Sequence, residues 1–136
     1  MFVDLDKFKP INDELGHEAG DAVLKTVAER MLSCVRQSDT VARFGGDEFV
    51  AILENLDHAD SAAVVAKKVI SKLMESIETP GGQHATVGAS IGISIFPKDG
   101  KTLDELARAA DEAMYAVKEE GRNNFKFYKD IKKQKA

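Results

Sequence analysis

Residues 41–53, VARFGGDEFVAIL, constrain the fold more than any other part of the chain. Two apolar runs of β-forming residues flank Gly45, Gly46, Asp47 and Glu48, a pattern that predicts a β-hairpin with these four residues at its tip. Glycine suits such a tip because tight turns often need a positive φ, which glycine adopts at little steric cost. The turn has no similar need for two adjacent carboxylates, so Asp47 and Glu48 require a separate explanation.

Hydrophobic periodicity predicts the other elements. Apolar residues alternate with small ones at 87–95, which indicates a strand with one buried face and an opposite face that a helix can approach. Thr102 and Glu105 form a capping-box pattern that opens a helix, and Gly121 suits its C-cap. The remaining expected elements are a strand at 2–5, a short helix at 11–15, helices at 20–37 and about 60–77, and a strand at 125–128.

This order predicts an α+β fold with a ferredoxin-like split β-α-β core, an antiparallel central sheet with helices on one face, and a C-terminal helix and strand as an extension. We expect one domain over residues 1–130, followed by a solvated or disordered lysine-rich tail at 131–136. In this topology the first and third strands are central neighbours. The end of the first strand at Asp4 should therefore meet the hairpin tip at Asp47.

Charge and composition narrow the class of protein. The 136 residues carry a formal net charge of −4 with a sequence pI of about 5.4, so nucleic acid is not an expected partner. No apolar run approaches the roughly 18 residues of a membrane span, and no export signal opens the chain. Cys34 is the single cysteine, and its helical apolar pattern favours a buried structural thiol. We expect a domain that faces the cytoplasm.

Asp4, Asp47 and Glu48 would together form a hard, oxygen-rich site that repels itself unless a cation is present. Mg²⁺, with Mn²⁺ as the alternative, suits such a site because it keeps positions for water and for substrate phosphates. The competing interpretation is that Asp4 and Asp6 end a strand and that Asp47 and Glu48 only solvate a turn.

Four segments resemble, in order and spacing, the motifs of the GGDEF family of diguanylate cyclases. Residues 43–49, RFGGDEF, contain the signature word without substitution. Residues 4–9 are similar to its D-x-D-x-F-K strand end, 12–21 to its N-x-x-x-G-H-x-x-G-D segment, and 111–123 to its D-x-A-L-Y-x-A-K-x-x-G-R-N helix end. One motif is weak evidence, but four in register are strong. The resemblance implies a nucleotidyl-cyclase-like version of the predicted fold.

The resemblance also implies that two GTP molecules are condensed into cyclic di-GMP, one held by each domain of a transient homodimer. Asp4, Asp47, Glu48 and the carbonyl of Leu5 would be the metal ligands. Asp47 and Glu48 would be catalytic, with Asp47 the candidate acceptor of the 3′-hydroxyl proton. Lys9 would stabilise charge on the phosphates in the transition state.

The implied substrate contacts extend over three of these segments. Lys118 and Arg122 would hold the triphosphate, and their spacing of four places them on one helix face. Asn12 and Asp21 would recognise guanine. The implied contacts are completed by His17, which has turn ordering as its alternative role, and by Gly45 and Gly46, whose backbone can approach phosphates without a Cβ.

Arg36 and Asp39 form an R-x-x-D word just before the hairpin, which resembles the family's product-inhibition site for cyclic di-GMP. The alternative is an ordinary helix-end arginine and a capping aspartate. The family's usual helix and D-x-L-T-G-L-x-N-R-like segment do not precede the first strand, so we expect a fragment or truncated form without its sensory or membrane domains. Two other functions stay open: a catalytically silent module that binds GTP or cyclic di-GMP, and a plain interaction domain.

Overall fold

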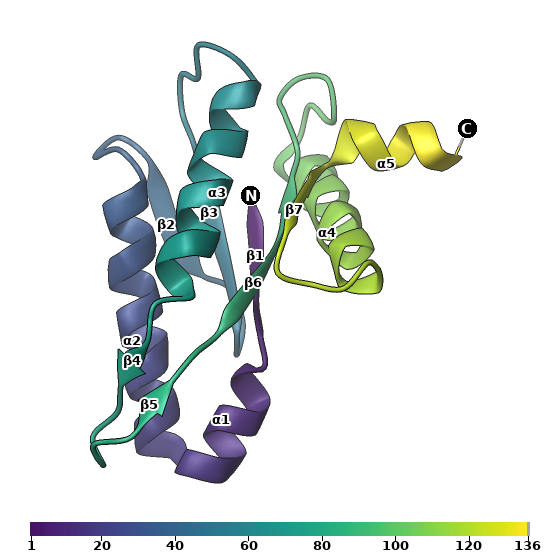
Figure 1. Ribbon diagram of the computed structural model, residues 1–136. Helices are drawn as coiled ribbons and strands as arrows, with labels where there is room; N and C mark the ends of the chain where they lie inside the picture. The colour runs from purple at the N-terminus through teal and green to yellow at the C-terminus, as the bar shows by residue number, and fades with distance from the viewer. Residues whose placement is uncertain (136) are drawn as a thin grey trace.

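The computed structural model describes residues 1–135 as a five-stranded sheet with helices on both faces (Figure 1). The strand order is β2-β3-β1-β6-β7, with β1 at the centre. All neighbours are antiparallel except β6 and β7. Along the chain, the first four strands of this sheet are β1, β2, β3 and β6. Their arrangement in the sheet is that of the split β-α-β fold, which confirms the predicted topology. The strands are β1 (Phe2–Asp6), β2 (Thr40–Arg43), β3 (Glu48–Ile52), β6 (Gly88–Ile93) and β7 (Phe125–Phe127).

The long helices form two layers (Figure 1). Helices α2 (His17–Cys34) and α3 (Asp60–Leu73) pack together on one face of the sheet, whereas α4 (Leu103–Glu119) packs against β6 and β1 on the other. The two helices of the predicted split β-α-β core thus share one face as expected, and the helix of the C-terminal extension, α4, covers the other. No helix in the described part of the chain is long and apolar enough to cross a membrane.

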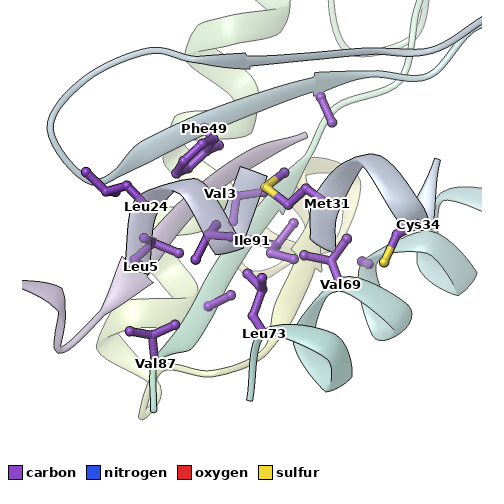
Figure 2. Close-up of a cluster of buried hydrophobic side chains, with 14 of the residues drawn as sticks. Val3, Leu5, Leu24, Met31, Cys34, Phe49, Val69, Leu73, Val87 and Ile91 are labelled. Atoms are coloured by element: carbon purple, nitrogen blue, oxygen red, sulfur yellow. The ribbon is translucent and has the colours of Figure 1, made fainter. Parts of the chain in front are cut away.

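The main core lies between the sheet and helices α2 and α3 (Figure 2). Alternate residues of β1 and β3 point into it because side chains alternate across a strand. Cys34 is one of its buried residues, as the sequence predicts for a structural thiol. Other buried members are Val3, Leu5, Val23, Val27, Met31, Phe49, Val69, Leu73, Val87 and Ile91.

The small residues of β6 admit α4 as predicted. A Cβ at Gly92 would lie 1.9 Å from the carbonyl oxygen of Ala110, so only glycine allows this helix to sit so close. The Ser94 hydroxyl donates to the Leu106 carbonyl at 2.7 Å. Because α4 covers this face, β6 is buried on both faces, not on one alone.

Several helix boundaries differ from the sequence prediction. Helix α1 spans Phe8–Leu15 and so begins before Pro10, which is tolerated because N–H groups in a first turn have no partner within the helix. Helix α2 begins at His17 and ends at Cys34. Helix α4 begins as predicted after Thr102, whose hydroxyl oxygen accepts a hydrogen bond from the Glu105 amide. Gly121 follows the C-cap with φ of 115°.

Helix α3 ends earlier than its apolar pattern suggests. The guanidinium of Arg30 donates to the carbonyls of Lys72, Glu75 and Ser76 and so closes the helix end. The expected last helical residue, Ile77, instead lies in β4 (Ile77–Glu78), which pairs with β5 (His84–Ala85) around the Pro80–Gly82 turn.

The C-terminal segment is also more ordered than expected. Strand β7 ends at Phe127, and helix α5 runs from Tyr128 to Lys135 with Ile131 buried. The expectation of a solvated or disordered tail is wrong for Ile131, which is buried, and its prediction of solvent exposure for 132–136 lies outside the described side chains. The division of the chain at residue 130 stays a prediction.

Candidate active site

The end of β1 and the tip of the β2–β3 hairpin meet as the topology predicts. Asp4 is the direct cross-strand partner of Glu48, and the Leu5 amide donates to the Asp47 carbonyl at 3.0 Å. The side chains of Asp4 and Glu48 therefore lie on the same face of the sheet, the face that α4 covers.

These carboxylates repel one another. Burial raises the pKa of Glu48 above its usual value, and the charges of Asp4, Asp111 and Asp47 raise it further, while Lys118 lowers it. Asp4 is only 6% exposed, and its Oδ1 is the one buried side-chain oxygen or nitrogen without a hydrogen-bond partner in the described residues. An unpaired buried carboxylate oxygen is costly, so this position is suited to a bound cation or donor.

Two cations border the site from α4 and the loop after it. The Lys118 ammonium forms an ion pair with Oδ2 of Asp4, and Arg122 Nη1 lies 3.8 Å from Oδ1 of Asp6. The Lys118 side chain is 23% exposed and that of Arg122 is 53% exposed. The structure therefore brings both predicted phosphate ligands to the acids of β1.

The loop of the hairpin is braced by Arg43. Its Nε donates to the Gly45 carbonyl and its Nη2 to the Gly46 carbonyl, each at 3.0 Å. Neither glycine has a positive φ, so the expectation that the turn needs glycine for its backbone angles is wrong. A Cβ at Gly46 would meet nothing within 4 Å. Within the described residues, neither backbone angle nor packing therefore requires glycine at position 46.

The predicted guanine contacts lie on α1 and at the start of α2. The Asn12 amide contacts Gly20 so closely that a Cβ on Gly20 would lie 2.2 Å from Asn12 Oδ1. Asn12 Nδ2 is 3.5 Å from His17 Nδ1, a contact that spans the turn between the two helices and favours the ordering role for His17. Lys9 is exposed in the first turn of α1, close in sequence to Asp4.

A groove of about 380 Å³ lies between α2 and the hairpin, and Asp21, Arg43 and Phe49 line it. The exposed carboxylate of Asp21 therefore faces open space beside the signature turn. A larger hollow of about 610 Å³ lies near Met1, at the other end of β1, and contains none of the predicted site residues.

Arg36 and Asp39 are brought together, but they already bind each other. Asp39 Oδ2 accepts from the Arg36 amide at 2.9 Å, and Oδ1 accepts from the Glu54 amide at 3.0 Å. The Arg36 guanidinium lies 3.6 Å from Asp39 and also donates to the Glu54 carbonyl. Burial alone would raise the pKa of Asp39, but the two amides and Arg36 outweigh it and lower that pKa.

Whether the site fits a divalent cation can be judged from its donors. Asp4 and Glu48 supply hard carboxylate oxygens, and the unpartnered Asp4 Oδ1 and the raised pKa of Glu48 both favour a bound positive charge. No group of three or more His, Cys, Asp or Glu side chains within the described residues is already gathered at metal-binding distance. The donor types therefore fit Mg²⁺, while a third side chain such as Asp47 would have to close in.

Sequence reasoning missed three residues of this site. Asp6, Asp111 and Asn123 received no functional role, although each lies in a segment that the motifs cover. The alternation of a strand places Asp6 on the same face as Asp4, and the spacing of seven places Asp111 on the same face of α4 as Lys118. Both signals were present in the sequence, whereas the position of Asn123 depends on the loop conformation.

Known proteins resemble the chain over most of its length. The family described as "Diguanylate cyclase, GGDEF domain" matches residues 1–124. The chain is 44% identical over 128 residues to the bifunctional diguanylate cyclase/cyclic di-GMP phosphodiesterase MucR of Pseudomonas aeruginosa, covering 94% of this chain and 18% of MucR. The chain is also 44% identical over 128 residues to the cyclic di-GMP phosphodiesterase NbdA of Pseudomonas aeruginosa. That match covers 94% of this chain and 16% of NbdA.

Among solved structures, the GGDEF domain of TpbB (YfiN) from Pseudomonas aeruginosa matches with a TM-score of 0.91 and 38% identity. That match covers 93% of this chain and 74% of the solved chain. The fold is thus shared almost completely with that domain, while the chain spans less than a fifth of the length of MucR and NbdA.

Proposed function

The chain belongs to the GGDEF family of diguanylate cyclase domains, and from that premise we propose that it condenses two GTP molecules into cyclic di-GMP and two pyrophosphates. The observation that carries the proposal is the buried, unpartnered oxygen of Asp4 opposite Glu48, whose own pKa is raised. Carboxylates that repel one another in this way suit a site completed by a bound cation and substrate phosphates.

Asp4, Glu48 and Asp47, with the carbonyl of Leu5, are the residues that would hold Mg²⁺ or Mn²⁺. When bound, such a cation lowers the pKa of a coordinated hydroxyl and offsets charge on phosphate oxygens. In the proposal Asp47 accepts the proton of the ribose 3′-hydroxyl. Its place beside the open turn of Gly45 and Gly46 leaves room for the nucleotide to approach.

Lys118 and Arg122 bind the triphosphate in this proposal, and Lys9 adds positive charge at the reacting phosphate. Support comes from the exposed Arg122 guanidinium and from the position of Lys118 beside Asp4. Because the resting Lys118 is paired with Asp4, nucleotide binding would exchange that partner for a phosphate oxygen.

Guanine recognition is assigned to Asp21 and Asn12, which flank the first turn of α2. A carboxylate can accept from both N1–H and N2–H of guanine, and adenine offers no such pair of donors. The groove beside Asp21 gives a purine access to that carboxylate.

The proposal has three further parts. Cyclic di-GMP inhibits the reaction by binding at Arg36 and Asp39, two chains form a transient catalytic homodimer, and the domain lies in the cytoplasm. The half-exposed Arg36 can still donate to a nucleotide, although Asp39 is engaged by backbone amides. The inhibitory role therefore depends mainly on the arginine.

A second function, binding of GTP or cyclic di-GMP without synthesis, is favoured by one observation. NbdA, which matches this chain as well as MucR does, is named as a phosphodiesterase and not as a cyclase. A domain of this sequence type thus occurs in a protein named for the breakdown of cyclic di-GMP.

One incubation separates the two functions. The purified chain is mixed with GTP and Mg²⁺, and cyclic di-GMP and pyrophosphate are quantified by chromatography. The cyclase proposal expects two pyrophosphates for each cyclic di-GMP and no product after EDTA is added. Binding of GTP in calorimetry without product at any protein concentration would support the silent module instead.

A further inference from the structure

We propose that Asp6 is a positioning residue, which fixes the loop at 121–123 and thereby holds the Arg122 guanidinium beside the acids of β1. The inference deepens the proposed function and rests on it, because Arg122 is taken there as a ligand of the triphosphate.

Asp6 is a buried carboxylate with both oxygens engaged. It is 4% exposed, its Oδ1 accepts from the Ser90 hydroxyl at 2.8 Å, and its Oδ2 accepts from the Asn123 amide at 2.9 Å. Asp4 differs, since one of its oxygens has no partner. Asp6 is therefore built to hold protein groups, whereas Asp4 is open to a ligand.

The loop that Asp6 holds has a conformation that side chains rarely adopt. Gly121, Arg122 and Asn123 have φ values of 115°, 66° and 51° in succession. Glycine tolerates this readily, but arginine and asparagine do so at a cost, so surrounding contacts must fix the loop. The Arg122 amide donates to the Val117 carbonyl at 3.0 Å, and Asp6 supplies the charged acceptor for the next amide.

The neighbouring strand leaves room for this arrangement. Gly88 is the cross-strand partner of Asp6, and a Cβ there would lie 3.0 Å from both Asp6 Oδ2 and Asn123 Oδ1. The Asn123 side chain in turn accepts from the Ala89 amide at 3.3 Å. The start of β6, the Asp6 carboxylate and the loop at Asn123 are therefore in direct contact with one another.

The result is a matched pair of acids and cations. Asp4 and Asp6 lie two residues apart on one face of β1, and their partners Lys118 and Arg122 lie four residues apart. At 3.8 Å the Arg122–Asp6 pair is loose, and the guanidinium stays half exposed. Arg122 is therefore directed toward the site but free to donate to an anion.

The test replaces Asp6 with the isosteric amide, D6N. This change removes the negative charge and places an NH₂ group where one carboxylate oxygen accepted a hydrogen bond from the Ser90 hydroxyl or the Asn123 amide. The probe is 3′-deoxy-GTP with Mg²⁺, which lacks the attacking hydroxyl and cannot be turned over. We expect its affinity in calorimetry to fall about tenfold, and as much in R122A. The matched control D130N changes an exposed aspartate of α5 and should bind like the parent.

The double variant D6N/R122A distinguishes positioning from an independent contribution. If Asp6 acts through Arg122, the double variant binds no more weakly than R122A alone. Hydrogen exchange at the Asn123 amide, followed by NMR, should also accelerate in D6N and stay unchanged in D130N. Additive losses, or unchanged exchange at Asn123, would overturn the proposal.

Two further outcomes are decisive as well. If R122A binds the probe like the parent, the triphosphate role of Arg122 fails, and Asn123 exchange still decides whether Asp6 fixes the loop. If D6N does not fold, S90A serves in its place, because it removes one donor and keeps the Asp6 charge. A smaller affinity loss in S90A, absent in the R122A background, supports positioning, and an additive loss contradicts it.

Discussion

Asp4 and Glu48 are direct cross-strand partners in β1 and β3, so two carboxylates face each other where a stable sheet would place opposite charges. Like charges at such a pair weaken a sheet, and the arrangement therefore sacrifices stability at the position where the proposed metal and phosphates bind. This conflict between fold and function makes Glu48 the most informative residue to change.

Replacing Glu48 by glutamine should reduce cyclic di-GMP synthesis by at least about a hundredfold, because one of the proposed charged ligands of the metal is lost. The fold should be retained, since the variant keeps the shape of the side chain. Product formation is measured by chromatography, and folding by circular dichroism. The matched control E78Q alters an exposed glutamate of β4 and should keep full activity. Undiminished synthesis by E48Q would remove Glu48 from the site.

The stability of the metal-free chain should depend on pH through Glu48. Its pKa lies above the ordinary 4.5, so ionisation costs the folded chain more than the unfolded one. Stability from protonated Glu48 is complete below pH 4.5 and is lost as pH rises through the raised pKa. The Tm of the parent should therefore fall relative to that of E48Q across this window and then run parallel to it. Thermal melts in EDTA at low salt measure this difference, and a pH-independent difference would contradict it.

At the proposed inhibitory site, Asp39 and Arg36 should behave differently. D39A leaves the amides of Arg36 and Glu54 without their acceptor and should lower the free energy of unfolding by about 1–3 kcal/mol. R36A keeps that carboxylate in place and should cost less than about 1 kcal/mol. Urea unfolding measures both changes.

Cyclic di-GMP binding to R36A is then a clean test, because this variant stays folded. We expect calorimetry to show at least tenfold weaker binding than the parent. Equal binding would show that Arg36 and Asp39 only join the end of α2 to the end of β3.

Gly92 should be the glycine least tolerant of change. G92A would place a Cβ 1.9 Å from the Ala110 carbonyl and 2.4 Å from the Met114 amide, so α4 must move off the sheet. We expect a loss of about 3 kcal/mol in the free energy of unfolding. The control G81A meets nothing within 4 Å and should change it by less than about 0.5 kcal/mol. Similar losses in both would indicate a general effect of removing glycine.

The sequence predicted those parts of the fold and site that depend on local patterns. The periodicity of the strands and helices predicted the order of the elements, and that order brought Asp4 to the hairpin tip, where the structure pairs it with Glu48, the residue after the expected Asp47. The motifs placed Lys118 and Arg122 near the same acids, as the ion pairs of both residues show.

The missed features depend on contacts between distant segments. Ile77 continues the apolar pattern of α3, yet Arg30, far earlier in the chain, binds the carbonyls of Lys72, Glu75 and Ser76 where that helix ends. Ile131 anchors a helix that its lysine-rich neighbours disguise. The role of Asp6 becomes visible only when a loop 117 residues later donates an amide to it.

The last prediction concerns the working unit. One chain carries one set of Asp4, Asp47 and Glu48, while the proposed product needs two nucleotides, so in the proposed homodimer each 3′-hydroxyl faces the α-phosphate held by a second chain. The hairpin tip is open for such an approach, with Phe44 beside it 69% exposed. Activity per chain should therefore fall when the protein is diluted about a hundredfold, because weak pairing is lost over that range. Initial rates of pyrophosphate release at saturating GTP measure this, with E78Q showing the same concentration dependence. A rate per chain that stays constant over the whole range would mean that a single chain completes the reaction, and the homodimer would have to be abandoned.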